Sequence, residues 1–293
     1  MSTARVAVAP PRGLALAVVV AAAAAWAALA LSAAGHGPAL DHHALGPVVG
    51  GLIGDPAAGA GASWLVRPEA AGPVAATGTV LLGWTVMVVA MMLPPALPML
   101  LVLRGLLARH PGRRPALAAG AGAFVAVWVV VGVGLVAGDV ALHVVAGRVA
   151  WLGTHPAAVP GAVLVAAGLY QFSPLKNACL RACRSPRGFA VAHWRGQRPA
   201  AVESATVAGA YALSCAGCCW ALMAVSFAVG VAALPLMVLL ATLMAVERLA
   251  PRGRLLVRPV GALALVLGTA LLAAGLLPAD LLPSWTTTSN ALR

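Results

Sequence analysis

Seven long apolar runs occupy most of this chain and limit what it can fold into. They cover residues 13–34, 78–103, 115–138, 157–175, 204–230, 232–249 and 258–278. Each run is long enough to cross about 30 Å of hydrocarbon, because an α-helix rises about 1.5 Å per residue. Only 9% of the residues are charged, whereas a soluble domain has about 25%. We therefore predict an all-α fold, a polytopic transmembrane helical bundle of about seven spans in contact with the lipid bilayer.

The basic residues give this bundle an orientation. With seven spans, 16 of the 19 Lys and Arg residues lie on one side of the membrane, in the segments 5–12, 104–114, 176–198 and 248–258. Only Arg67, Arg148 and Arg293 lie on the other side. Because basic residues accumulate in cytoplasmic loops, we predict a multi-pass protein of the cell inner (plasma) membrane with its N-terminus inside and its C-terminus outside. The net charge of +12 then reflects topology, and we predict no nucleic-acid partner.

These spans divide the chain into four parts. Residues 1–34 hold the first span, 35–77 an extracytoplasmic loop, 78–278 a six-span metal-binding membrane domain, and 279–293 an extracytoplasmic tail. An alternative for the first span is a cleaved signal peptide. Its apolar run of about 22 residues is longer than the usual core of 7–15 residues, which favours a retained span.

The extracytoplasmic loop carries a small group of polar side chains: His36, Asp41, His42 and His43. Imidazole and carboxylate groups are ordinary ligands for divalent metal ions. A solvated loop without metal is the preferred interpretation, and metal binding there remains open.

The five cysteines of the chain are grouped, and three of them lie in C-A-G-C-C within the fifth apolar run. In a helix, Cys215, Cys218 and Cys219 lie within about 100° of one another, and Met223 extends the same stripe by one turn. A helix that enters the membrane near Ser204 places them near the middle of the bilayer. Buried cysteine can also act as a small apolar residue. Three thiols within five residues favour metal binding.

A second group of sulfur ligands lies in the second apolar run. Met87 and Met91 are one helical turn apart, and Met92 is adjacent, at a depth that overlaps that of the cysteines. Methionine is also a common core filler, so packing is the alternative. Three prolines follow and lack the N–H that a helix interior needs, so we expect them to break or kink the helix: Pro94, Pro95 and Pro98.

The remaining two cysteines form C-L-R-A-C on a basic segment after the fourth run. A helical turn between Pro174 and Pro186 would place Cys179 and Cys183, at positions i and i+4, on one side. A reduced structural pair is the alternative to metal exchange.

These segments resemble the signatures of a bacterial family of predicted metal-binding integral membrane proteins, a family of unknown function. The family's A-M-M-x-P-x-x-x-P element, preceded by a tryptophan, is matched at 84–98. Its Y-Q-x-x-P-L-K-x-x-C-L-x-x-C-R-x-P element is matched at 170–186, and its G-C-C-W-x-L-M element at 217–223, with an acidic-basic pair at Glu247 and Arg248. The resemblance implies a membrane location and the handling of a metal, with copper foremost. It implies no established reaction.

Sulfur ligands select Cu(I) or zinc, and thioethers beside thiols favour Cu(I). We therefore predict a Cu(I)-binding protein that moves copper across the inner membrane or delivers it to a copper-carrying protein, as a copper chaperone does. We assign no catalytic residue, and non-enzymatic metal handling is preferred. The predicted metal ligands are Cys215, Cys218, Cys219, Met91, Met92, Met87, Met223, Cys179 and Cys183.

Two alternatives remain. One is a membrane thiol-disulfide oxidoreductase that exchanges electrons with quinone through its cysteines. The other is a membrane scaffold with a structural zinc ion. Such an ion would be held tetrahedrally by Cys179, Cys183, Cys215 and Cys218, which requires the cytoplasmic segment to fold back toward the middle of the bilayer.

Overall fold

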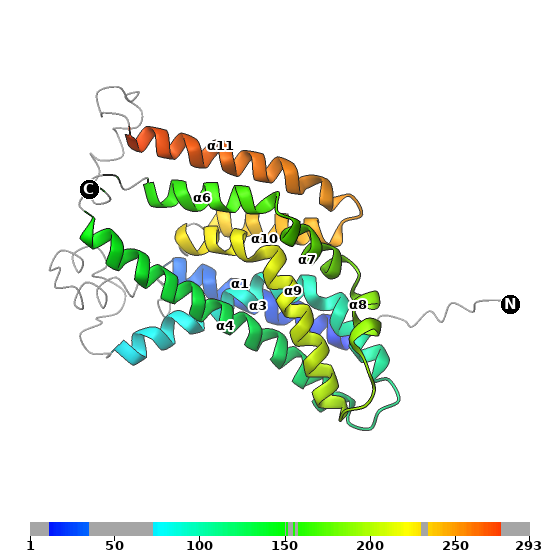
Figure 1. Cartoon of the computed structure of the whole chain (residues 1–293). Helices are drawn as coiled ribbons and strands as arrows, with labels where there is room; N and C mark the ends of the chain where they lie inside the picture. Colours follow the sequence, from blue (N-terminus) through cyan, green and yellow to red (C-terminus); the bar gives the residue numbers. More distant parts are fainter. Residues whose placement is uncertain are drawn as a thin grey trace.

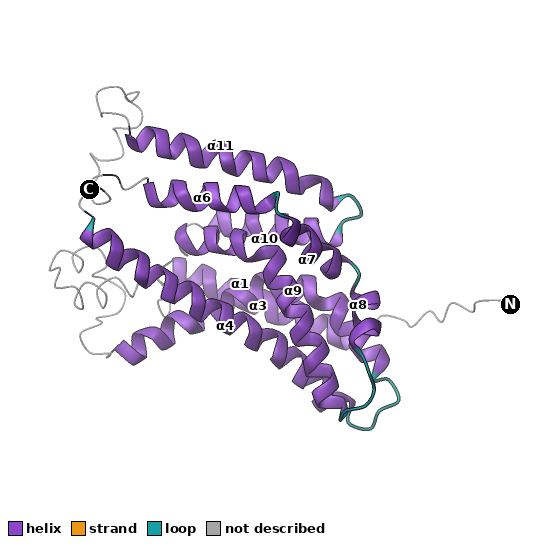
Figure 2. Cartoon of the chain, viewed as in Figure 1, coloured by secondary structure: helices purple, strands orange, loops and turns teal. Residues whose placement is uncertain are grey.

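The computed structural model describes residues 12–34, 73–149, 151, 155, 158–229 and 234–276, and within these ranges it contains helices and no strand. The all-α prediction is therefore confirmed for the described residues. The loop histidines predicted as an open metal site, His36, His42 and His43, lie outside them. Figures 1 and 2 show the helices, which are α1 (Arg12–Ala33), α3 (Pro73–Leu106), α4 (Arg113–Arg148), α6 (Ala158–Gln171), α7 (Pro174–Arg184), α8 (Pro186–His193), α9 (Ala200–Val229), α10 (Leu234–Leu249), the 3-10 helix η5 (Gly253–Leu256) and α11 (Val257–Leu276).

Five of these helices are long and apolar enough to cross a membrane: α1, α3, α4, α9 and α11. The pair α6 and α7 passes the same test together but is bent by 65°, so that a sixth span is available if the pair counts as one. The predicted runs 157–175 and 232–249 correspond to α6, with 14 residues, and α10, with 16 residues. Both are shorter than a typical span of about 20 residues. By length and composition the structure thus supports five or six spans, and the count of seven remains a prediction.

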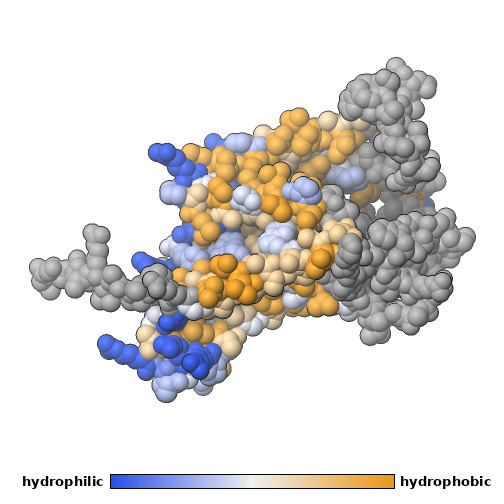
Figure 3. Space-filling view, turned by 180° about the vertical axis from the view of Figure 1, so that it is seen from behind, coloured by the Kyte–Doolittle hydropathy of each residue, from blue (hydrophilic) through white to orange (hydrophobic). Residues whose placement is uncertain are grey.

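Helices α3 and α9 form the centre of the bundle. More than half of the apolar stretch of each is buried, compared with less than a third in α1, α4 and α11. Figure 3 shows the molecule from behind. Apolar residues cover the middle of its surface, and hydrophilic residues gather at one end. The ends of α3 and α10 and the starts of α4, α9 and α11 lie at this end (Figure 1), where most of the arginines occur.

The prolines of the second apolar run do not interrupt its helix. Pro94, Pro95 and Pro98 all lie inside α3, which continues from Pro73 to Leu106. Of the expected break or kink, the break was wrong, and a kink stays a prediction. A long helix packed on several neighbours can tolerate missing N–H donors, because only the hydrogen bonds of those residues are lost and the flanking turns remain.

Helix α11 packs closely along α6 because glycines line their contact. A Cβ atom added at Gly168 would lie 2.8 Å from Leu265 Cγ, and one at Gly268 would lie 2.7 Å from the Val165 nitrogen. Small residues at such positions let two helix backbones approach. This pair forms one edge of the bundle (Figure 1).

A tight turn separates α6 from α7. Ser173 caps α7, since its Oγ accepts a hydrogen bond from the Lys176 backbone N–H at 3.0 Å, and Pro174 occupies the first helical turn. Both features favour a new helix start at this point. The helical turn expected between Pro174 and Pro186 is therefore present, and α7 packs against α9.

Candidate metal centre

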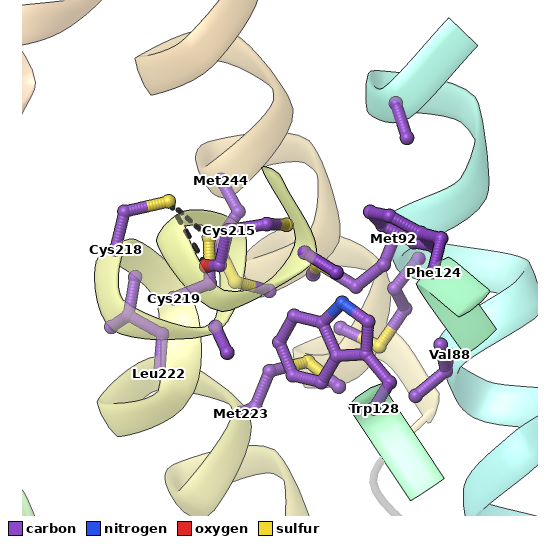
Figure 4. Close-up of a cluster of buried hydrophobic side chains, with 14 of the residues drawn as sticks. Val88, Met92, Phe124, Trp128, Cys215, Cys218, Cys219, Leu222, Met223 and Met244 are labelled. Atoms are coloured by element: carbon purple, nitrogen blue, oxygen red, sulfur yellow. Dashed lines mark hydrogen bonds between the residues drawn. The ribbon is translucent and has the colours of Figure 1, made fainter. Parts of the chain in front are cut away.

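Helix α9 places three thiols in the middle of the protein interior. Cys215, Cys218 and Cys219 are each at most 1% exposed. The Cys218 Sγ lies 3.1 Å from the Cys219 Sγ and also donates to the Cys215 carbonyl oxygen at 3.1 Å. Figure 4 shows these side chains with the interactions drawn as dashed lines. The grouping that the sequence predicted on one face of the helix is thus present.

A fourth thiol joins this group from α7. The Cys183 Sγ lies 3.6 Å from the Cys218 Sγ. The Cys183 side chain is buried. We call Cys183, Cys215, Cys218 and Cys219 the thiol cluster. The contact of Cys183 with Cys218 shows that the segment after α6 folds back onto α9, which the sequence left as an alternative geometry.

The fifth cysteine lies beside the cluster. Cys179, one turn before Cys183, is partly exposed. Its Sγ packs against the backbone of Gly217, where an added Cβ would lie only 2.5 Å away. The Tyr170 hydroxyl donates a hydrogen bond to the Gly217 carbonyl oxygen from the end of α6. Gly217 thus lets Cys179 and Tyr170 approach the stretch of α9 that carries the cluster.

Polar contacts fix α7 in this position. The Lys176 Nζ and the Glu247 Oε2 form an ion pair of 2.7 Å, with both side chains 1% exposed. Arg184 donates to the Glu247 carbonyl oxygen at 2.6 Å and to the Pro251 carbonyl oxygen at 2.8 Å. The Tyr211 hydroxyl donates to the Cys183 carbonyl oxygen at 2.9 Å. Both α10 and α9 therefore hold the helix that supplies Cys183.

Methionines surround the thiol cluster in the same buried core. Figure 4 draws Met92 from α3, Met223 from α9 and Met244 from α10 together with three of the cysteines, and all three methionines are fully buried. Met87 and Met91 are also buried in this core. Sequence reasoning missed Met244 as a candidate, since the methionines of its apolar run are not adjacent to any cysteine in sequence.

A buried arginine faces the thiols. The Arg248 guanidinium is 3% exposed and interacts electrostatically with all four cysteines of the cluster. Its Nη1 lies 3.9 Å from the Met92 Sδ, and its Nη2 donates to the Tyr211 hydroxyl at 3.5 Å. Its Nε has no hydrogen-bond partner among the described residues. Its contacts with described residues include no carboxylate, and burial of a charge without such a partner is unfavourable.

The thiols are packed against one another. Four sulfurs around a metal with bonds of about 2.3 Å lie about 3.8 Å apart, and the Cys218–Cys219 separation of 3.1 Å is shorter. Accordingly, no group of three or more Cys, His, Asp or Glu side chains in the described part of the chain has an arrangement that could hold a metal ion. The donor set nevertheless fits a soft metal, because all its nearby ligands are sulfur.

Fold and core together define a helical protein with a buried sulfur cluster and several helices compatible with membrane insertion. The chain belongs to the PpoB2 copper chaperone family, whose model matches residues 81–271. This range contains the thiol cluster, the methionines and Arg248. Copper handling in general is therefore established for the family. No curated protein and no solved structure matches the chain.

Proposed function

We propose that this protein is a Cu(I) carrier of the inner membrane that holds the ion at the thiol cluster. It spans the membrane seven times, with the N-terminus in the cytoplasm, and transports copper or delivers it to a copper-carrying partner. The observation that supports the site is the contact of Cys183 with Cys218, 3.6 Å between sulfurs. Helices α7 and α9 thereby contribute thiols that are 35 residues apart in sequence to one buried place.

Charge and ligand type favour monovalent copper at this site. Cu(I) accepts soft thiolate and thioether ligands, and the neighbouring methionines supply thioethers. Two thiolates with one Cu(I) ion carry a net charge of −1, which the Arg248 guanidinium balances. Because an unbalanced charge in the interior is strongly unfavourable, Arg248 acts as the fixed counter-charge of the loaded site.

Cys179 provides the route by which copper reaches the cluster. It is partly exposed, whereas Cys183, one turn further along α7, is buried. A donor protein can transfer the ion to Cys179 by ligand exchange, and Cys183 then takes it inward. Residues Met87, Met91 and Met223 line the surrounding core and assist as thioether ligands during passage, together with Met92.

Copper titration of the purified full chain under reducing conditions tests this proposal. A chromophoric Cu(I) chelator should compete for about one ion per chain. Cys183→Ala should lose most of the bound copper because it removes one of the clustered thiols. Leu180→Ala is the matched control: it removes a larger buried side chain from the same helix and leaves every sulfur in place. Equal copper loss in both variants would assign the effect to packing and refute the site.

The partly exposed cysteine gives a separate kinetic prediction. Cys179→Ser should retain the copper of the unmodified protein but release it more slowly to an external chelator, because the exchange ligand is missing. Stopped-flow measurement of chelator absorbance checks this. Unchanged copper release rates would show that Cys179 is not part of the route. Recovery of tightly held zinc in place of copper would favour the structural zinc alternative.

A further inference from the structure

A basic cavity lies at the polar end of the molecule, separate from the thiol cluster. It has a volume of about 590 Å³ and is formed where the turn between α10 and α11 meets the turn between α6 and α7. Three arginines line it, from the turn and from the start of α11: Arg252, Arg254 and Arg258. No Asp or Glu among the described residues lines it. The cavity therefore presents positive charge that no carboxylate in its wall balances.

A buried amide in the wall lacks a partner. Gln171, the last residue of α6, is 1% exposed and lines the cavity. Neither its Nε2 nor its Oε1 makes a hydrogen bond to any described residue. Buried amide groups are rarely left in this state, because removal from water without a new hydrogen bond is unfavourable. A ligand oxygen placed in the cavity would accept a hydrogen bond from the Nε2.

The rim of the cavity is apolar. Phe172 and Leu255, which also line it, are 46% and 69% exposed. At the end of a membrane-crossing helix pair, such side chains contact the outer part of the acyl chains while arginines face the headgroups. Basic cavities between helices at the cytoplasmic side are suited to anionic headgroups.

We propose that this cavity binds the phosphate of an anionic phospholipid, with phosphatidylglycerol as the simplest representative. Arginine forks bind phosphate oxygens in pairs, the Gln171 amide donates to a third oxygen, and the acyl chains lie against Phe172 and Leu255. The site is independent of copper binding. Its wall includes Pro251, whose carbonyl oxygen accepts a hydrogen bond from Arg184 of α7, so that a bound lipid also steadies the turn on which α7 rests.

Native mass spectrometry of the full chain tests the lipid site. The protein is reconstituted in nanodiscs of phosphatidylcholine and phosphatidylglycerol, extracted, and examined for retained lipid. Arg254→Gln with Arg258→Gln should lower retained phosphatidylglycerol about tenfold, since each charge-assisted hydrogen bond contributes substantially. The control, Arg109→Gln with Arg113→Gln, removes the same charge from the turn between α3 and α4. Equal loss of retained phosphatidylglycerol in both double variants would show that the lipid is held by general attraction to the basic surface, and it would overturn the proposal.

Two further arms complete the test. Gln171→Leu should weaken retention of phosphatidylglycerol and leave phosphatidylcholine unchanged, and retention equal to the unmodified protein would overturn the role of the buried amide. Inorganic phosphate in excess should displace the lipid poorly, because it lacks acyl chains. Displacement by inorganic phosphate as effective as by soluble short-chain phosphatidylglycerol would assign the cavity to a free phosphate and overturn the lipid assignment. Copper stoichiometry, measured in every variant, reports that each has folded.

Discussion

Arg248 is the residue on which the chemistry of the buried centre depends most. It interacts electrostatically with four thiols, and its contacts with described residues are long, at 3.9 Å to the Met92 Sδ and 3.5 Å to the Tyr211 hydroxyl. In the proposed copper site, this guanidinium would balance the charge of an anionic copper–thiolate group and so offset the cost of its own burial.

Replacement of Arg248 by glutamine should therefore weaken Cu(I) binding. We expect a loss of about tenfold to a hundredfold in affinity, since removal of one partner of a buried charge pair is strongly unfavourable. Competition with a Cu(I) chelator measures it. Arg187→Gln, which removes an exposed arginine from α8, is the control and should bind as the unmodified protein does. An Arg248→Gln variant with unchanged affinity would show that the guanidinium does not balance the site.

At the scale of single residues, the sequence was sufficient to predict that the cysteines of α9 lie close together. It was insufficient to predict which residues of other helices lie beside them. Cys215, Cys218 and Cys219 share a face because of the helical repeat, which can be worked out from their spacing in the sequence. Met244 and Arg248 reach the same place from α10, and their relation to the thiols depends on how helices pack. The family resemblance singled out Arg248 as part of a motif without giving it a role.

Among the helices, α7 determines whether the site is complete. It carries Cys183 and Cys179, and the buried ion pair of Lys176 with Glu247 joins it to α10. The sequence predicted a helical turn between two prolines, and the cap at Ser173 explains why it begins there. The direction of the 65° bend after α6 is set by contacts with α9 and α10, which are distant in sequence. The position of α7 was therefore not predictable from its own residues.

Gly217 allows a direct test of that packing. In Gly217→Ala the new methyl group would lie 2.5 Å from the Cys179 Sγ and 3.4 Å from the Cys179 Cβ, so the Cys179 side chain must turn away and α7 shift slightly from α9. We expect weaker copper binding and faster alkylation of Cys183, measured by mass spectrometry. Gly209→Ala lies on the same helix, with nothing within 4 Å of the added atom, and should leave both properties unchanged. Similar behaviour of the two variants would contradict a close α7–α9 contact.

The whole molecule has a polar end and an apolar middle, as Figure 3 shows. Helices α6 and α10 are shorter than ordinary spans, yet they lie among the long helices (Figure 1). The sequence predicted their apolar character, and it overestimated the length of the fourth run because the apolar composition continues past the turn at Ser173. Hydropathy alone cannot separate a straight span from a helix pair that bends.

Cysteine labelling in a background without native cysteines tests the proposed topology. Cysteines introduced at His193 and Arg254 should react only with a reagent that enters the cytoplasm, because both positions lie in the predominantly basic segments. A cysteine at Trp151 should react from outside. External labelling at position 193 or 254 would refute the seven-span arrangement with the N-terminus inside.

X-ray absorption at the copper edge of the purified, reduced full chain tests the proposed copper centre most directly. We expect monovalent copper bound only by sulfur, at bond lengths near the roughly 2.3 Å typical of metal–thiolate bonds, and fewer sulfur neighbours in Cys183→Ala than in Leu180→Ala. A spectrum dominated by nitrogen or oxygen ligands, or one that Cys183→Ala leaves unchanged, would contradict a copper site shared by α7 and α9.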